Sequence, residues 1–161
     1  MYNATIFLYR KFCGVDYGMP LMTDDLASLL PLQKFPLQKI EASEILHHFG
    51  TFDGAKHGLD RPLWVSEDYD CAYQYKNFGV AAPRYTKLVT AIAFEIVDLN
   101  GVSLQSIAEK LGYQDHSEWN NRLAAHLSDN GFLGLVYVGR EILLADPSKL
   151  IKTAGVCSVD A

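Results

Sequence analysis

Short apolar runs rich in β-branched and aromatic residues alternate with segments of helical spacing, and this alternation most constrains the fold. The runs predict strands at residues 5–10, 63–66, 87–97, 132–138 and 141–144. The longest, 87–97, is apolar throughout most of its length. We therefore expect it to be one central strand with Leu88, Ile92, Phe94 and Ile96 buried.

The segments between these runs have helical periodicity and end signals. They predict a short helix that is capped by Thr23-Asp24-Asp25 and runs through Leu30, and further helices at 40–49, at 67–75, at 104–111 and at 117–128. The pair Gly139-Arg140 predicts a tight hairpin between the last two strands, and residues from 153 onward are small and polar. The chain is thus predicted to form one α+β domain over residues 1–152, followed by a flexible tail at 153–161.

Composition and charge exclude several function classes. Hydrophobic residues make up 49% of the 161 residues and charged residues 20%, which is typical of a globular domain with a sizeable core. The formal net charge of −5 disfavours broad, non-specific binding to nucleic acid or to anionic membranes.

Targeting and cysteine signals point to a reducing environment. No apolar run approaches the ~20 residues that span a bilayer, and no secretory signal pattern begins the sequence. Cys13, Cys71 and Cys157 are odd in number and widely spaced, which argues against a disulfide framework or a zinc site. The sequence predicts a cytoplasmic protein, or one delivered into a host or target cell without a standard signal peptide, and no metal.

Three polar residues stand at the margins of predicted strands. Arg10 ends the first run, Ser66 ends Leu63-Trp64-Val65-Ser66, and Glu141 begins the strand that leads into Asp146-Pro147-Ser148. Strand ends beside a cleft commonly carry function on a rigid scaffold. We expect the three side chains to line one cleft.

In order and context, these segments resemble the mono-ADP-ribosyltransferase family, the cholera-toxin-like enzymes that split NAD. Leu8-Tyr9-Arg10 is similar to the family's opening strand, Trp64-Val65-Ser66 with Ala72 to its second element, and Glu141 to its third. The resemblance implies a split mixed β-sheet core of the ADP-ribosyltransferase type, flanked by helices.

The resemblance also implies a site and a reaction. Arg10, Ser66 and Glu141 would be catalytic, while Arg10, Tyr9, Trp64 and Tyr75 would bind NAD, which serves as co-substrate. The enzyme would be a bacterial or phage toxin or effector that modifies a macromolecule, a protein rather than a nucleic acid, with a cognate inhibitor or immunity protein as a further partner. Arginine-modifying members carry Glu or Gln where this sequence has Gly139, so the resemblance implies a different acceptor.

Two alternatives remain open from the residues. The diphtheria-like branch of the family uses a His and two tyrosines, and His48 with Tyr69, Tyr73 and Tyr75 fits that variant. Tyr69 and Tyr73 also have the i,i+4 spacing of ordinary core packing. The second alternative is a non-catalytic protein that binds a partner through a fold of the same type, because fold alone does not fix function.

Overall fold

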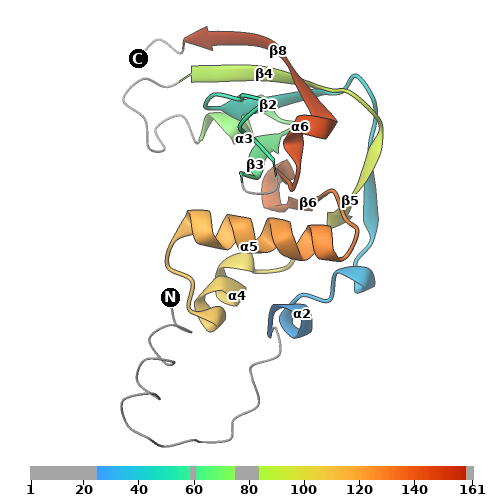
Figure 1. Cartoon of the computed structure of the whole chain (residues 1–161), viewed down its shortest axis with the longest axis vertical. Helices are drawn as coiled ribbons and strands as arrows, with labels where there is room; N and C mark the ends of the chain where they lie inside the picture. The colour runs from blue at the N-terminus through green and yellow to red at the C-terminus, as the bar shows by residue number, and fades with distance from the viewer. Residues whose placement is uncertain (1–24, 59–60, 75–83, 159–161) are drawn as a thin grey trace, which may run out of the picture.

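The computed structural model describes residues 25–58, 61–74 and 84–158, which form a single mixed α+β domain with an eight-stranded sheet (Figure 1). Its strands are β1 (Leu37–Ile40), β2 (Ile45–Phe49), β3 (Leu63–Ser66), β4 (Arg84–Thr90), β5 (Phe94–Asp98), β6 (Gly134–Tyr137), β7 (Glu141–Leu144) and β8 (Ile151–Ser158). Its α-helices are α2 (Asp25–Leu29), α3 (Tyr69–Tyr73), α4 (Leu104–Leu111), α5 (His116–Asp129) and α6 (Pro147–Leu150). Short 3-10 turns are η1 (Leu32–Lys34) and η2 (Val138–Arg140).

The sheet has two halves that meet at a narrow junction. The strand order is β1-β5-β6-β7-β3-β2-β4-β8, and every neighbouring pair is antiparallel except β5–β6. Strands β3 and β2 share a single register pair, His47 with Ser66, whereas β3 pairs with β7 and β2 pairs with β4 along their lengths. The junction therefore has fewer paired residues than any other neighbouring pair of strands in the sheet.

Helices α2, α4 and α5 cover one face of the first half of the sheet (Figure 1). Both α4 and α5 lie in the connection between the parallel strands β5 and β6, as such crossovers require. Their apolar residues, among them Leu104, Leu123 and Leu127, join Leu135 and Leu143 of the sheet in one buried cluster. This helical layer contributes residues of α4 and α5 to a wall opposite β3 and β7.

A second buried cluster draws a residue from every strand and from α6. It includes Ile40, Ile96 and Ile142 from the first half and Leu46 and Leu88 from the second. The two halves of the sheet therefore curl over a common core, which fixes their relative placement around the junction.

Local capping explains the ends of the helices. The hydroxyl of Ser103 accepts a hydrogen bond from the backbone N–H of Ser106 at the start of α4, and Gly112 ends that helix with a φ of 80°. At the start of α5 the cap is Asp115, which accepts from the N–H of Glu118. The predicted helices at 104–111 and 117–128 are confirmed, within two residues at each end.

The predicted helix at 40–49 is wrong, because this stretch contains the end of β1, a turn and β2. A residue far along the chain fixes the turn. The hydroxyl of Thr90 donates to the carbonyl of Glu41 at 2.6 Å, and it accepts from the N–H of Glu44 at 2.8 Å. Leu46 is then buried from an extended conformation. Long-range pairing outweighs the local helical spacing here.

The predicted single strand at 87–97 is also wrong in part. Strand β4 ends at Thr90 and β5 begins at Phe94, and the two lie in different halves of the sheet. Phe94, Leu88 and Ile96 are buried as predicted, but Ile92 lies in the bend between the strands and is 50% exposed.

The predicted flexible tail is corrected up to residue 158. Residues 153–158 belong to β8, which pairs with β4 over its whole length and forms one edge of the sheet. The strand predicted at 5–10, which carries Tyr9 and Arg10, lies outside the described residues, as does Tyr75.

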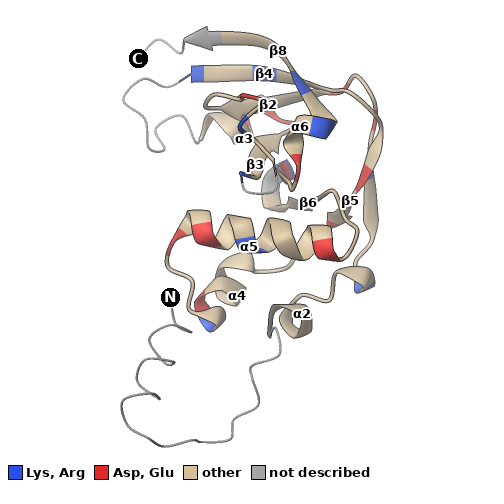
Figure 2. Ribbon diagram, in the orientation of Figure 1, with Lys and Arg blue, Asp and Glu red and all other residues tan. Residues whose placement is uncertain are grey.

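Charges of both signs are distributed over the described helices and strands (Figure 2). None of the described helices is long and apolar enough to cross a membrane.

Candidate functional site

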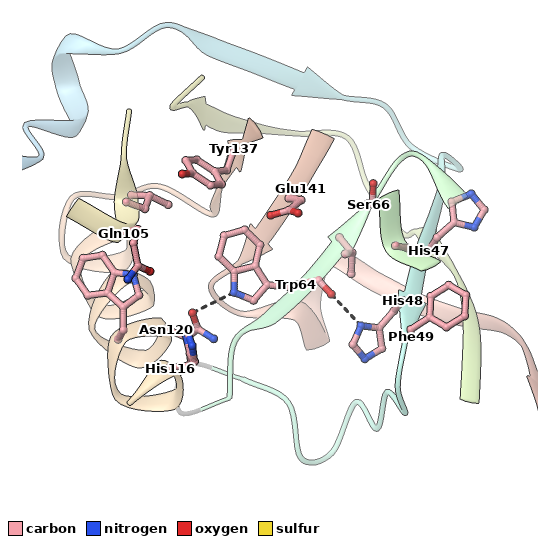
Figure 3. A pocket seen from close by; sticks show the side chains of 14 residues that line it. His47, His48, Phe49, Trp64, Ser66, Gln105, His116, Asn120, Tyr137 and Glu141 are labelled. Carbon is pink, nitrogen blue, oxygen red and sulfur yellow. Dashed lines mark hydrogen bonds between the residues drawn. The ribbon is translucent and has the colours of Figure 1, made fainter. Parts of the chain in front are cut away.

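A cavity of about 480 Å³ opens at the junction of the two sheet halves, opposite the helical wall (Figure 3). Residues of β2, β3, β6 and β7 form one side of it, and residues of α3, α4 and α5 form the rest. A volume of this size is in the range of small-molecule and cofactor sites. Ser66, Trp64 and Glu141, three residues that the sequence singled out, all line it.

The sheet register aligns four of the lining side chains. Tyr137 pairs with Glu141 across β6 and β7, Glu141 with Ser66 across β7 and β3, and Ser66 with His47 across β3 and β2. Directly opposed residues on neighbouring strands lie about 5 Å apart on the same face of a sheet. A tyrosine, a carboxylate, a hydroxyl and an imidazole thus form one row that crosses the junction.

Ser66 holds the turn that precedes Glu141. Its side chain is only 2% exposed, and its hydroxyl donates to the carbonyl of Arg140 at 3.1 Å. The same oxygen accepts from the N–H of Asp68 at 3.0 Å. The helix cap of α3 is Asp68 itself, whose carboxylate accepts from Asp70 and Cys71. Ser66 is therefore a brace between β3 and β7 and not the cap of a helix.

Glu141 begins β7 directly after that turn, and its side chain is partly exposed to the cavity. Arg140 has a φ of 65°, which directs the chain sharply into the strand. The thiol of Cys71 on α3 lies 4.0 Å from Glu141 Oε1. Burial raises the pKa of Cys71, with the nearby carboxylates of Glu141 and Asp68 acting in the same direction, so the thiol stays protonated at neutral pH.

His48 has a fixed ring orientation on the cavity wall. Its Nδ1 donates to the backbone carbonyl of Trp64 at 2.8 Å, because a carbonyl can only accept. Burial lowers the pKa of His48 more than this bond raises it, so the ring is neutral at pH 7. In that tautomer Nε2 is a hydrogen-bond acceptor.

Gly50 allows this position of the His48 ring. A Cβ atom built on Gly50 would collide with His48 Nε2, and the φ of Gly50 is 151°. We expect Gly50→Ala to displace the ring and to destabilise the protein by about 1–3 kcal/mol, which urea denaturation would measure. Gly101→Ala is the matched control, since Gly101 has a φ of 89° but a Cβ atom built there has no atom of the described residues outside its own chain neighbours within 4 Å. If both variants lost the same free energy of unfolding, backbone strain alone, and not the collision with His48, would explain the destabilisation.

The lowered pKa of His48 predicts a loss of stability in acid. As the pH falls below about 6.5, the unfolded chain takes up the proton before folded His48 does, so protonation favours unfolding. His48→Gln removes this component. We expect the melting temperature of the variant to fall less than that of the parent between about pH 7.5 and pH 5.5. Parallel pH profiles would contradict the assignment.

An aromatic cluster surrounds His47 and Phe49 of β2 beside the junction. The His47 ring stacks on Tyr85 at 5.8 Å, and its Nδ1 lies 2.6 Å from the Tyr85 hydroxyl. Burial, followed by the charge of Lys87, lowers the pKa of His47. Tyr69 and Tyr73 belong to the same cluster and are 42% and 37% exposed, so the core-packing interpretation of their spacing is wrong.

The helical wall contributes residues that sequence reasoning missed. The indole Nε1 of Trp64 donates to Asn120 Oδ1 at 3.1 Å, which connects β3 to α5 across the cavity (Figure 3). Gln105 of α4 and His116 of α5 also line the cavity. Helical periodicity identifies the buried face of α5, but it does not show which polar residue beside that face reaches a cavity.

Comparisons of the chain with protein-family models, with curated proteins and with solved structures gave no match. Within residues 25–58, 61–74 and 84–158 there is no group of three or more His, Cys, Asp or Glu side chains that could hold a metal ion.

Proposed function

We propose that this protein is an NAD-dependent mono-ADP-ribosyltransferase, a bacterial or phage toxin or effector that acts on a macromolecule. The observation that carries the proposal is the direct pairing of Ser66 with Glu141 inside a 480 Å³ cavity at the junction of a two-part sheet. The resemblance of the Trp64-Val65-Ser66 and Glu141 segments to the family supports the same reaction.

The chemistry follows from the charge of Glu141. Cleavage of the bond between nicotinamide and ribose develops positive charge on the sugar, as in glycoside hydrolysis. A carboxylate beside the sugar stabilises that charge, and it can accept a hydrogen bond from a ribose hydroxyl. Ser66 acts on the Arg140 carbonyl and so positions the turn from which Glu141 projects.

Two residues are candidates for the remaining role, which is to bind NAD. Arg10 would bind phosphate or ribose oxygens through its planar fork. Neutral His48 would accept a hydrogen bond from a ribose hydroxyl, and it already lines the cavity with a fixed ring. Arg10→Ala and His48→Ala should be compared by calorimetric titration with NAD, and the residue that fills the role is the one whose loss weakens binding.

The direct test is incubation with NAD labelled in its adenylate part. Release of nicotinamide, together with transfer of label to a macromolecule in a lysate, would support the proposal, and mass spectrometry would identify the acceptor. Gly139, two residues before Glu141, offers no side chain where arginine-modifying enzymes carry Glu or Gln, so we expect an acceptor other than arginine. NAD binding without turnover would favour the non-catalytic alternative, and absence of binding would refute the proposal.

A further inference from the structure

The face of the sheet that the helical layer covers in the first half carries exposed side chains in the second half. Across the junction this face continues from Ser66 to His47, and the register then places Lys87 of β4 beside His47. Along β4 every second residue points to the buried core instead, as its alternating burial shows. We call this part of the face, which bears His47, Phe49, Tyr85, Lys87 and Lys152, the open face.

Aromatic side chains form the part of the open face next to α3. Tyr69 and Tyr73 of α3 stack on each other with their ring centroids 6.0 Å apart, and both rings contact Phe49 of β2. Tyr69 also meets Tyr85 edge to face at 5.2 Å. These neighbours hold the two tyrosine rings in place, yet 42% of Tyr69 and 37% of Tyr73 remain exposed. A planar ligand can stack on a ring that is both held and exposed.

Cations lie on the same strands as these rings, although the whole chain has a net charge of −5. Strands β2, β4 and β8 contain no acidic residue, and Lys87 and Lys152 are exposed on them (Figure 2). Burial lowers the pKa of His47, and the charge of Lys87 lowers it further, so Lys87 acts at short range on the aromatic cluster. Asp68 and Asp70, at the start of α3, are acidic residues beside the tyrosines. The strands therefore present positive charge and α3 presents the stacked rings.

A lysine on the middle strand of the open face favours a phosphate-bearing partner over an ordinary protein surface. Strand β4 lies between β2 and β8, and charged residues are depleted from the centre of protein interfaces because their desolvation is costly. Phosphate groups supply the opposite charge that Lys87 and Lys152 need. Gly155, the register partner of Lys87, leaves room for a ligand, since a Cβ atom built on it meets no atom of the described residues beyond its chain neighbours within 4 Å.

We propose that the open face and the two tyrosines of α3 bind single-stranded nucleic acid, with bases on Tyr69 and Tyr73 and phosphates on Lys87 and Lys152. Unpaired bases stack on exposed aromatic rings whatever their sequence, and lysines follow the backbone. Neither contact involves the sugar, so DNA and RNA strands should bind alike. The inference goes beyond the proposed function, because Tyr69, Lys87 and Lys152 do not line the cavity.

Fluorescence anisotropy with labelled oligo(dT) of about 12 nucleotides tests the electrostatic part of the inference. We expect saturable binding that weakens as the salt concentration rises, and equal affinity for oligo(U). Replacing Lys87 and Lys152 together by Gln should reduce the slope of log binding constant against log salt concentration by about 0.7 for each lysine. Lys110→Gln, at an exposed position of α4, is the matched control and should leave the slope unchanged.

Substitution of Tyr69 tests the stacking. Tyr69→Leu should weaken binding of oligo(dT) by about 5- to 100-fold, the effect of losing one base stacked on an aromatic ring, whereas Tyr69→Phe keeps the ring and should keep the affinity. Near-parental circular dichroism and melting of the exposed lysine variants would show that their loss of binding is not a loss of fold.

Three outcomes would overturn the inference. They are no saturable binding of either oligonucleotide by the parent, an unchanged affinity and salt slope in the double lysine variant, and displacement of oligo(dT) by polyglutamate of equal charge as effective as displacement by unlabelled oligo(dT). The last outcome would assign the open face to an acidic protein. Release of nicotinamide from NAD is measured separately, so failure of this inference leaves the proposed function intact, and failure of the proposed function leaves this inference intact.

Discussion

Glu141→Gln is expected to slow release of nicotinamide from NAD by about 10²–10³-fold, the usual effect of removing one preorganised electrostatic contact from a transition state. Glutamine keeps the shape of the side chain and much of its hydrogen bonding but removes the negative charge. Since that charge matters mainly after the bond begins to break, the affinity for NAD should change far less than the rate.

The measurement separates the chemical step from binding. Nicotinamide release under single-turnover conditions reports the chemical step, and calorimetric titration reports the affinity for NAD. Glu95→Gln is the matched control, because Glu95 is an exposed glutamate on β5 and does not line the cavity. A Glu141→Gln protein that releases nicotinamide at the parental rate would remove Glu141 from the site.

The strands at the centre of the site were predictable from local sequence. Leu63–Ser66 and Glu141–Leu144 are short apolar runs with clear boundaries, and both are confirmed as strands. The antiparallel hairpin between β6 and β7 is also confirmed, with η2 as its turn. Such runs are read correctly because both strands are largely buried, so the composition of the run alone indicates its structure.

The second half of the sheet was not predictable in the same way. The spacing of Ile40, Ile45 and Phe49 suits a helix, but the hydroxyl of Thr90 and pairing with β4 hold the segment extended. Residues 153–158 are small and polar, yet β4 pairs with them across the edge of the sheet. In both cases the deciding partner is distant in the chain.

The same reason limits what sequence could reveal about the site. Ser66 and Glu141 were recognisable from their places at strand ends, but their direct pairing depends on the register of β3 with β7. Asn120 gives no signal in the sequence, since it sits beside the apolar face of α5 like any solvated residue. Its place on the cavity wall follows only from the fold and from the hydrogen bond with Trp64, 56 residues away.

The bend between β4 and β5 predicts very different costs for two neighbouring truncations. Phe94 is 6% exposed and packs in the cluster that the two sheet halves share, whereas Ile92 is 50% exposed in the bend. Phe94→Ala should lower the free energy of unfolding by about 3–5 kcal/mol through lost burial and the cavity left behind. Ile92→Ala should lower it by only about 1 kcal/mol, because half of that side chain is already in water.

Urea denaturation followed by circular dichroism would measure both free energies, with Ile92→Ala as the control for any general effect of shortening a side chain in this segment. For a domain of this size the Phe94 variant should also melt about 6–20 °C below the parent. Similar losses in the two variants would mean that Ile92 is as buried as Phe94. The segment would then have to be one continuous central strand, and the two halves of the sheet would not separate at Ala91–Ala93.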